Sequence, residues 1–268
     1  MNKKIIFSTG GTGGHIFPAI NLMRHFSQKG HQVLLVTDSR GNNFLKDYSE
    51  FRSYTLNTET LTNKNLFKKI LSFFVIVLCI IRSIIILKKE KPDLIFGFGG
   101  YVSFPISFSS KLFNLPLIIY ENNMLLGRAN KYLSFFSKKI LVAKNIKENF
   151  SEKNRNKTFQ VGSIIDKKII NYSIHKKVRN NKSFCVLVLG GSQGAEIFGN
   201  IIPSVIKEIK EKGFPIEVIQ QCTDGQKNKI IEFYEKNKIP NHVFEFDSNI
   251  IRLILSSDLA ITRCGAST

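Results

Sequence analysis

Short apolar runs alternate with longer mixed stretches along most of the chain. The runs are rich in β-branched residues and bounded by glycine, proline or polar residues, a pattern typical of buried strands in a parallel sheet. In the first part of the chain they predict strands over residues 5–8, 32–37, 93–98, 117–120, 139–142 and 158–161. The mixed stretches between them predict helices over residues 17–28, 65–89, 102–113 and 128–136.

A charged segment without a clear period, residues 163–183, separates this series from a second one. The second series predicts strands over residues 184–189, 216–220, 243–246 and 259–262, with helices over 195–212, 224–238 and 249–256. Two such series predict an α/β protein with two Rossmann-like, doubly wound parallel sheets that face a cleft. We therefore expect one domain over residues 1–162 and another over 163–268, with ligands beyond the carboxyl ends of the strands.

The predicted helix over residues 65–89 is apolar around nearly its whole circumference from Phe67 to Leu87, whereas a helix on a sheet needs only one buried stripe. Its most apolar part, residues 73–87, would cover about 22 Å of a roughly 30 Å hydrocarbon layer and contains Arg82, which argues against a transmembrane span. With basic residues around it, the helix is typical of a patch that lies on an anionic membrane surface. A fully buried helix or a dimer face is the alternative. The apolar start of the chain is too short for a signal peptide.

The chain of 268 residues carries 39 basic and 20 acidic side chains, a formal net charge of +19. This charge suggests an anionic partner, either nucleic acid or a membrane surface, although a lysine-rich composition without tryptophan is also what AT-rich coding produces. The sequence has no zinc-finger spacing, basic heptad or aromatic RNA-binding segment, so we expect no nucleic-acid partner. The four cysteines are dispersed and predict neither a disulfide framework nor a zinc site, which fits the reducing cytosol.

Three glycine-rich turns follow predicted strands, at residues 10–15 (GGTGGH), 97–105 (GFGGYVSFP) and 190–195 (GGSQGA). Such turns bind phosphate through backbone amides and the dipole of the following helix, although a plain strand-to-helix turn is an equal alternative for any single one. None matches the dinucleotide fingerprint or the Walker motif, and the sequence contains no D-x-D. The pattern predicts a diphosphate held by backbone dipoles, with no metal ion and no other cofactor.

Five strings, taken in order, resemble those of the MurG family of peptidoglycan N-acetylglucosaminyltransferases: GGTGGHIFPAI, GFGGYVSFP, ENNMLLGRANKYL, VLGGSQGAEIFGNIIP and ITRCGAST. The resemblance implies the GT-B fold and an inverting, metal-independent transfer of N-acetylglucosamine from UDP-GlcNAc to the 4-hydroxyl of MurNAc in lipid I, which gives lipid II. It implies a role in peptidoglycan synthesis and cell-wall biogenesis, and so in cell shape, cell division and the cell cycle. It also implies a peripheral location at the cytoplasmic face of the bacterial inner (plasma) membrane, with other cell-wall synthesis proteins as further partners.

The resemblance assigns roles to residues of the first domain. His15 matches the general base, and an imidazole suits this role because it titrates near cellular pH. Glu121 is the alternative base, and a histidine that caps the following helix is the structural alternative for His15. The other matched positions contact substrate: Thr12, Gly13 and Gly14 beside the sugar and pyrophosphate, Tyr101 toward the acceptor, and Asn123 on the donor sugar.

In the second domain the resemblance assigns Gly191, Ser192 and Gln193 to the loop that cradles the UDP diphosphate, and Asp247 to a backbone contact with uracil. One departure concerns the family string N-P-V-R, which is here SIID, so that Asp166 stands where the family has an arginine unless Lys167 takes its role. The chain also stops inside the last family string, and we expect a second domain truncated at its C-terminal end. The alternative functions are a catalytically inactive nucleotide-sugar-binding fragment and another GT-B transferase with a lipid acceptor.

Overall fold

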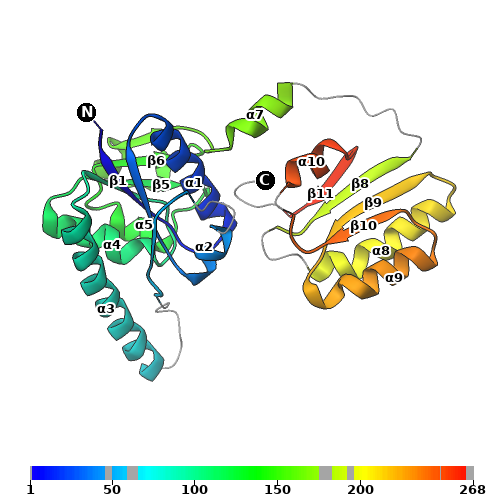
Figure 1. Ribbon diagram of the computed structural model, residues 1–268, viewed down its shortest axis with the longest axis horizontal. Helices are drawn as coiled ribbons and strands as arrows, with labels where there is room; N and C mark the ends of the chain where they lie inside the picture. The colour runs from blue at the N-terminus through cyan, green and yellow to red at the C-terminus, as the bar shows by residue number, and fades with distance from the viewer. Residues whose placement is uncertain are drawn as a thin grey trace. The chain divides into compact units, whose positions relative to one another are not determined.

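The computed structural model describes residues 2–45, 50–58, 66–174, 183–191, 196–247 and 249–263. The chain divides between Asp166 and Lys167 into two compact units, here called unit 1 and unit 2, whereas the sequence predicts a boundary slightly earlier, after Gly162. Each unit is built on a parallel sheet with helices between successive strands (Figure 1). The predicted α/β class with two parallel sheets is therefore confirmed.

The sheet of unit 1 has, within the described residues, the order β3-β2-β1-β4-β5-β6-β7, and all neighbouring strands are parallel. Its strands are β1 (Lys4–Ser8), β2 (Gln32–Thr37), β3 (Ser53–Thr55), β4 (Leu94–Gly97), β5 (Leu117–Glu121), β6 (Lys139–Val142) and β7 (Thr158–Gln160). The chain winds first from β1 toward β3 and then from β4 toward β7. Parallel sheets of this kind bind ligands beyond the carboxyl ends of the two strands where the winding reverses, here β1 and β4.

The helices of unit 1 are α1 (Gly13–Gln28), α2 (Ser39–Phe44), α3 (Leu66–Glu90), α4 (Ser103–Ser109), α5 (Arg128–Leu133) and α6 (Glu152–Arg155), with the 3-10 helices η1 (Ser110–Phe113) and η2 (Lys147–Asn149). Helix α1 begins at Gly13, earlier than the predicted start at Phe17, because its glycine-rich first turn has no apolar period. His15 therefore lies inside the first turn of α1 and does not precede the helix.

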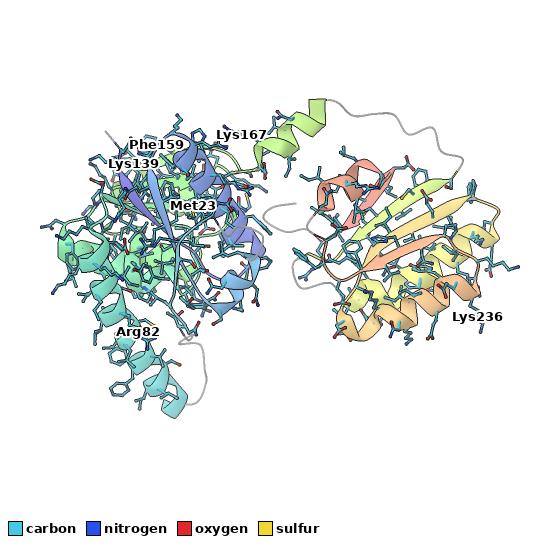
Figure 2. All side chains as sticks on the ribbon, viewed as in Figure 1. Met23, Arg82, Lys139, Phe159, Lys167 and Lys236 are labelled. Atoms are coloured by element: carbon cyan, nitrogen blue, oxygen red, sulfur yellow. The ribbon has the colours of Figure 1, made fainter. Side chains whose placement is uncertain are left out.

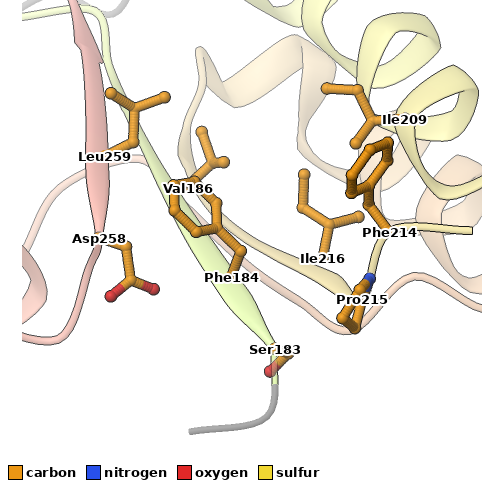
Figure 3. A pocket seen from close by; sticks show the side chains of 9 residues that line it. All are labelled: Ser183, Phe184, Val186, Ile209, Phe214, Pro215, Ile216, Asp258 and Leu259. Atoms are coloured by element: carbon orange, nitrogen blue, oxygen red, sulfur yellow. The ribbon is translucent and has the colours of Figure 1, made fainter. Parts of the chain in front are cut away.

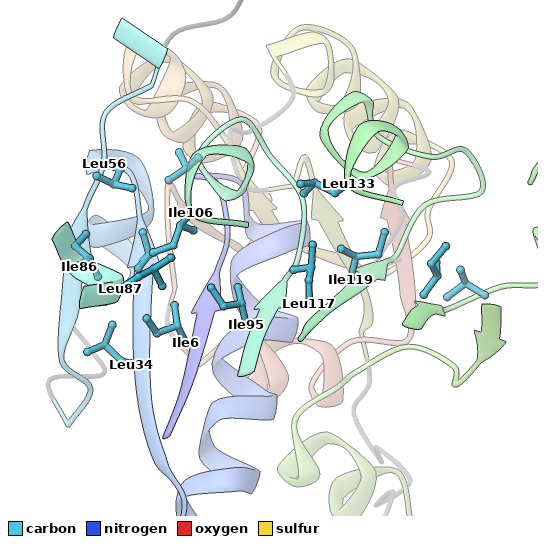
Figure 4. Close-up of a cluster of buried hydrophobic side chains, with 14 of the residues drawn as sticks. Ile6, Leu34, Leu56, Ile86, Leu87, Ile95, Ile106, Leu117, Ile119 and Leu133 are labelled. Carbon is cyan, nitrogen blue, oxygen red and sulfur yellow. The ribbon is translucent and has the colours of Figure 1, made fainter. Parts of the chain in front are cut away.

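Both faces of the sheet of unit 1 are buried, which explains the continuous apolar runs of its strands. Along β1, Ile6 belongs to one core cluster, whereas Ile5 and Phe7 belong to the other. Figure 4 shows the first cluster, whose labelled members come from strands and from helices α3, α4 and α5, except Leu56, which directly follows β3. The second includes the buried face of α1 and a row of rings in which Phe96 lies 5.7 Å from Phe7 and 5.1 Å from Phe98 between centroids.

The sheet of unit 2 has the order β10-β9-β8-β11 in its described part, again with parallel neighbours. Its elements are α7 (Lys167–Ile174), β8 (Phe184–Leu189), α8 (Glu196–Glu211), β9 (Ile216–Gln221), η3 (Asp224–Gln226), α9 (Lys227–Lys236), β10 (Asn241–Phe244), α10 (Ile250–Leu255) and β11 (Leu259–Thr262). Helix α7 lies in the charged segment over residues 163–183 that separates the two predicted series, where the sequence predicts no helix. Its Ile169 and Ile170 are both exposed, and no buried stripe marks the helix in the sequence.

Helix α3 is buried along one stripe only, formed by Ser72, Cys79, Ser83, Ile86, Leu87 and Glu90. Apolar side chains that are 49% to 60% exposed cover much of its remaining surface: Ile70, Leu71, Phe73, Phe74, Leu78, Ile81 and Ile85. Figure 1 shows the N-terminal part of α3 extending beyond the body of unit 1, and Figure 2 shows the side chains there, with Arg82 labelled. The alternative of a fully buried helix is therefore wrong. Within the described residues, Ile70–Glu90 is the helical segment long and apolar enough to cross a membrane, by length and composition only.

The C-terminal end of α3 is fixed by Glu90, a carboxylate only 5% exposed. The hydroxyl of Tyr54 donates to it over 2.6 Å, and it forms ion pairs with Lys4 at 3.2 Å and Arg52 at 3.1 Å. The Tyr54 hydrogen bond, helped by the two cations, lowers the pKa of Glu90 below its ordinary value. This cluster ties the last turn of α3 to β1 and to the chain at β3.

Candidate active site

The glycine turns after β1 and β4 touch each other at the carboxyl edge of unit 1. The amide of Gly10 donates to the carbonyl oxygen of Gly99 over 3.1 Å. A Cβ on Gly10 would lie 3.0 Å from the Cα of Gly100, and Gly99 and Gly100 have φ angles of +85° and +80°. Because this approach leaves no room for side chains, glycine is required where the two turns meet.

His15 lies beside this junction, in the first turn of α1. Its imidazole is half-buried and donates a hydrogen bond to the carbonyl oxygen of Phe98. Burial lowers the pKa of His15 below its ordinary value, while the negative charge of Glu121 and the Phe98 carbonyl act in the opposite direction. Since Phe98 holds one ring nitrogen, the other nitrogen is the one that can accept a proton from a substrate.

Glu121 ends β5 and is only 1% exposed. Its Oε1 accepts from the backbone amide and the side-chain Nδ2 of Asn123, at 3.0 and 2.7 Å. Its Oε2 accepts from the backbone amide of Gly127 at 2.9 Å and from Nδ2 of Asn130 at 3.0 Å. These four hydrogen bonds occupy the carboxylate, so Glu121 organises the following loop and acts on His15 through its charge.

The remaining residues predicted in unit 1 lie around the same edge. Thr12 is the exposed N-cap of α1, and its side chain makes no cap hydrogen bond. Gly13 and Gly14 form the start of α1, where backbone amides have no partner within the helix. Tyr101, in the turn after β4, is 39% exposed, and Asn123 is half-buried beside Glu121.

The departure from the family string after β7 has a structural counterpart. Asp166 forms an ion pair with Arg24 of α1 at 3.5 Å. Two residues earlier, the backbone amide of Ile164 donates to the hydroxyl of Tyr120 over 3.3 Å. The carboxylate of Asp166 is therefore neutralised inside unit 1, while Lys167 is exposed at the start of α7.

In unit 2 the glycine turn follows β8. Gly191 is exposed and has a φ angle of +85°, a conformation that favours glycine. Ser192 and Gln193 lie outside the described residues. The side chain of Gln221, at the end of the neighbouring β9, accepts from the amide of Gly190 at 3.1 Å and donates to a backbone carbonyl just after β10 at 3.0 Å. Gln221, which the sequence analysis does not select, therefore orients the start of the turn.

Asp247 lies half-buried in the loop after β10. Its Oδ1 accepts from the backbone amide of Asn249 over 2.6 Å. The carboxylate is thereby engaged by the chain that leads into α10, and a uracil contact at this position would have to use the backbone, as the family pattern implies.

A cavity of about 430 Å³ lies at the amino ends of β8, β9 and β11 (Figure 3). Its wall is mostly apolar, with Asp258 among the lining residues Ser183, Phe184, Val186, Ile209, Phe214, Pro215, Ile216 and Leu259. Asp258 accepts a hydrogen bond from the amide of Cys185 over 2.8 Å. Within unit 2 the cavity lies at the opposite ends of the strands from the glycine turn and is separate from that turn.

Comparison with known proteins gives matches over both units. Residues 5–142 match the glycosyltransferase family 28 N-terminal domain, and residues 185–268 match the glycosyltransferase family 28 C-terminal domain. A Rickettsia canadensis protein named UDP-N-acetylglucosamine--N-acetylmuramyl-(pentapeptide) pyrophosphoryl-undecaprenol N-acetylglucosamine transferase is 36% identical over 99% of this chain and 74% of its own length. A protein of the same name from Pelagibacter ubique is 32% identical over 100% of this chain and 74% of its own length. The crystal structure of MurG from Acinetobacter baumannii has a TM-score of 0.73 at 24% identity and covers 99% of this chain and 74% of that one.

Proposed function

Because the chain belongs to glycosyltransferase family 28, we propose that it transfers N-acetylglucosamine from UDP-GlcNAc to lipid I and thereby forms lipid II. It is an N-acetylglucosaminyltransferase of peptidoglycan synthesis with two parallel-sheet domains of the GT-B type. The relatives support neither another lipid-acceptor transferase nor an inactive nucleotide-sugar-binding fragment, because the names of those compared state this transfer.

The observation that carries the mechanism is the half-buried imidazole of His15 at the switch point of unit 1. The 4-hydroxyl of MurNAc attacks the anomeric carbon of GlcNAc opposite the diphosphate. A C1–O4 bond forms with inversion, the bond from C1 to the diphosphate oxygen breaks, and its electron pair leaves with UDP. His15 takes the hydroxyl proton through the nitrogen that Phe98 does not hold. Because its pKa is lowered by burial, this base is neutral at cellular pH.

Glu121 supports His15 in this proposal and does not compete with it as a base. Its lone pairs are occupied by four donors, and its charge stabilises the imidazolium that forms when His15 takes the proton. The loop that it organises carries Asn123, which contacts the donor sugar. Thr12, Gly13 and Gly14 lie beside the sugar and pyrophosphate, and Tyr101 faces the acceptor.

Unit 2 binds the donor in this proposal. The turn at Gly191, together with Ser192 and Gln193, meets the UDP diphosphate through backbone amides, and the loop of Asp247 meets the uracil. Dipoles aimed at the leaving diphosphate stabilise the charge that develops on it. The expectation of no metal ion stays a prediction; no three His, Cys, Asp or Glu side chains in the described part of the chain group as metal ligands.

We also propose that α3 holds the enzyme peripherally on the anionic cytoplasmic face of the inner membrane. Its exposed apolar part, from Ile70 to Ile85, has a length of about 24 Å at 1.5 Å per residue, short of a roughly 30 Å hydrocarbon layer. The next turn packs into the core through Ile86 and Leu87, which supports a helix that lies on the bilayer. Exposed Arg82 favours anionic lipid. A dimer face stays the alternative for α3, and contacts with other cell-wall synthesis proteins stay a prediction.

The transfer is tested with radiolabelled UDP-GlcNAc and a lipid I analogue. We expect label to appear in a disaccharide product with a β linkage, together with one UDP released for each product. The matched control replaces the acceptor by an analogue that lacks the 4-hydroxyl, which leaves no nucleophile and should give no product. Tight binding of UDP-GlcNAc without any product would support the inactive binding fragment instead.

The membrane proposal is tested by sedimentation with vesicles that contain anionic phospholipid. We expect the chain to sediment at low salt and to be largely released at high salt, because attraction to the surface is screened beyond a Debye length of about 8 Å at physiological salt. Replacing Phe74, Leu78 and Ile81 by serine should abolish sedimentation and leave the circular dichroism spectrum unchanged. The matched control replaces Ile197, Ile201 and Val205, which are 59%, 49% and 42% exposed on α8, and should still sediment. Equal binding by both triple variants would contradict the proposal.

A further inference from the structure

A buried asparagine outside the residues selected from the sequence connects α5 to the candidate active site. Asn130 is fully buried, with a relative exposure of 0%. Its Nδ2 donates to Oε2 of Glu121 at 3.0 Å and to the carbonyl oxygen of Tyr120 at 3.1 Å. Both acceptors carry negative or partial negative charge, so the amide has to present its nitrogen to them, and the orientation of the side chain is fixed.

The same amide lies across Gly99 from the candidate base. A Cβ on Gly99 would lie 3.3 Å from Nδ2 of Asn130 and 3.4 Å from Cε1 of His15. The amide of Asn130 and the imidazole of His15 therefore both border the space that the missing side chain of Gly99 leaves open. Oδ1 of Asn130 is buried without a hydrogen-bond partner among the described residues. Burying an unpaired oxygen costs free energy, and the fold bears this cost while the nitrogen of the same amide bonds Glu121.

We propose that Asn130 is a positioning residue that holds the Glu121 carboxylate in the orientation from which its charge acts on His15. Asn130 and the amide of Gly127 are the two donors to Oε2, while Asn123 holds Oε1. Without the Asn130 amide, three of the four hydrogen bonds remain, but Oε2 keeps only the backbone donor of Gly127, so the orientation of the carboxylate is less tightly fixed. The inference rests on the proposed role of His15 as the base.

The other charged groups at this edge do not replace Glu121. Asp38 and Arg40 pair with each other at 2.9 Å, and Asp38 accepts from the amide of Gly11 at 3.3 Å. Arg128 is exposed at the start of α5. The charge that acts on His15 is that of Glu121, and its effect is to raise the pKa of His15 against the larger influence of burial.

The experiment is a histidine NMR titration of the chain without substrates, in which the His15 signal is assigned by its loss in His15→Gln. We expect Glu121→Gln to move the titration midpoint of His15 to lower pH, because a negative charge is removed. Asn130→Ala should move it in the same direction by a smaller amount. In the double variant the midpoint should equal that of Glu121→Gln, because Asn130 acts only through Glu121.

The matched control is Asn154→Ala. Asn154 is also a buried asparagine of unit 1, 5% exposed, and its Nδ2 donates to Ser134 at 3.1 Å. We expect Asn154→Ala to lower the melting temperature and to leave the His15 midpoint at its wild-type value. An Asn130→Ala midpoint equal to that of Asn154→Ala, or an additive shift in the double variant, would overturn the proposal.

A second measurement uses the unsubstituted chain and stands if Asn130→Ala does not fold. The side-chain amide of Asn130 is followed through the same titration by nitrogen-labelled NMR. We expect its resonance to shift with the midpoint of His15, because Asn130 bonds the carboxylate whose charge acts on His15. An amide resonance that stays constant while His15 titrates contradicts the proposal. Neither measurement requires transfer, so a failure of the proposed function leaves this test intact.

Discussion

The carboxyl edges of the two sheets differ in the chemical groups that they carry. In unit 1 the edge carries a connected set of side chains, in which His15, Glu121 and Asn130 are half or fully buried. In the described part of unit 2 the edge carries buried Gly190, whose amide donates to Gln221, and exposed Gly191. A side-chain network can move a proton and tune its acceptor, whereas backbone amides offer fixed dipoles to an anion. The comparison teaches that substitutions in unit 1 should change the rate and those in unit 2 the affinity for the donor.

The largest expected effect tests whether substitutions in unit 1 change the rate of transfer. His15→Ala removes the proposed base, and we expect kcat for transfer to fall by about 10²–10⁴-fold. Donor affinity should change by no more than a few-fold, because unit 2 holds UDP-GlcNAc in the proposal. Initial rates at saturating substrates and calorimetry with UDP-GlcNAc measure the two quantities separately. His242→Ala, at an exposed histidine of β10, is the control and should transfer at the wild-type rate. A kcat above a tenth of wild type in His15→Ala would make His15 structural.

The pH dependence of kcat gives the next effect. The pKa of His15 is lowered, with burial as the main cause, so the neutral base persists below the ordinary value of 6.5. We expect kcat to stay level as pH falls through 6.5 and to decline only at lower pH, by about tenfold per unit in the limiting region. A decline centred above pH 6.5 would mean that another group governs the rate.

The affinity side of the comparison is tested at Gly191. A β-branched residue is strained at a φ angle of +85° and brings a side chain to the turn. We expect Gly191→Val to weaken UDP binding by about tenfold, which corresponds to ~1.4 kcal/mol. Single-turnover transfer from donor that is already bound should be nearly unchanged. Unaltered UDP binding by calorimetry would remove this turn from the donor site.

A smaller effect is expected at Gln221. Gln221→Leu keeps the volume of this 8% exposed side chain and removes its hydrogen bonds to Gly190 and to the chain after β10. We expect about a threefold loss of UDP affinity, since the turn loses its fixed orientation while its amides remain. Asn241→Leu, at the amino end of β10, removes a side-chain hydrogen bond to the carbonyl oxygen of Ile239 and is the control, which should bind UDP normally. If Asn241→Leu weakens UDP binding as much as Gln221→Leu does, the effect is not specific to the turn.

The sequence predicts the order of most strands and helices because most of the strands are continuous apolar runs. The bounds of β2, β6, β8 and β11 agree with the predicted ranges, since each is an apolar run with clear ends. Strand β3 was not predicted, because its three residues, Ser53 to Thr55, form no apolar run and lie at the sheet edge. Helix α2 was not predicted either; it is short, and only Gly41 within it is buried.

The candidate site was predicted only in part. His15 and Glu121 stand in strings with a recognisable order, and their place after strands predicts that they meet at one sheet edge. The supporting side chains were missed, because their role depends on contacts between separate elements. Asn130 reaches back from α5 to Glu121, and Gln221 reaches from β9 to the turn after β8. A polar residue in the first turn of the helix after such a strand is the signal that would have found Asn130.

Helix α3 can also be described in mechanical terms, as a lever with one fastened end. Its 25 residues extend over about 37 Å, and its polar fastening is Glu90 with Lys4, Arg52 and Tyr54. Lys4 is the first residue of β1, so this fastening lies at the amino edge of the sheet, whereas His15 and Glu121 lie at the carboxyl edge. If α3 holds the enzyme on a bilayer as proposed, a load on its N-terminal turns would be received where the strands begin, away from the edge at which His15 is proposed to take the proton.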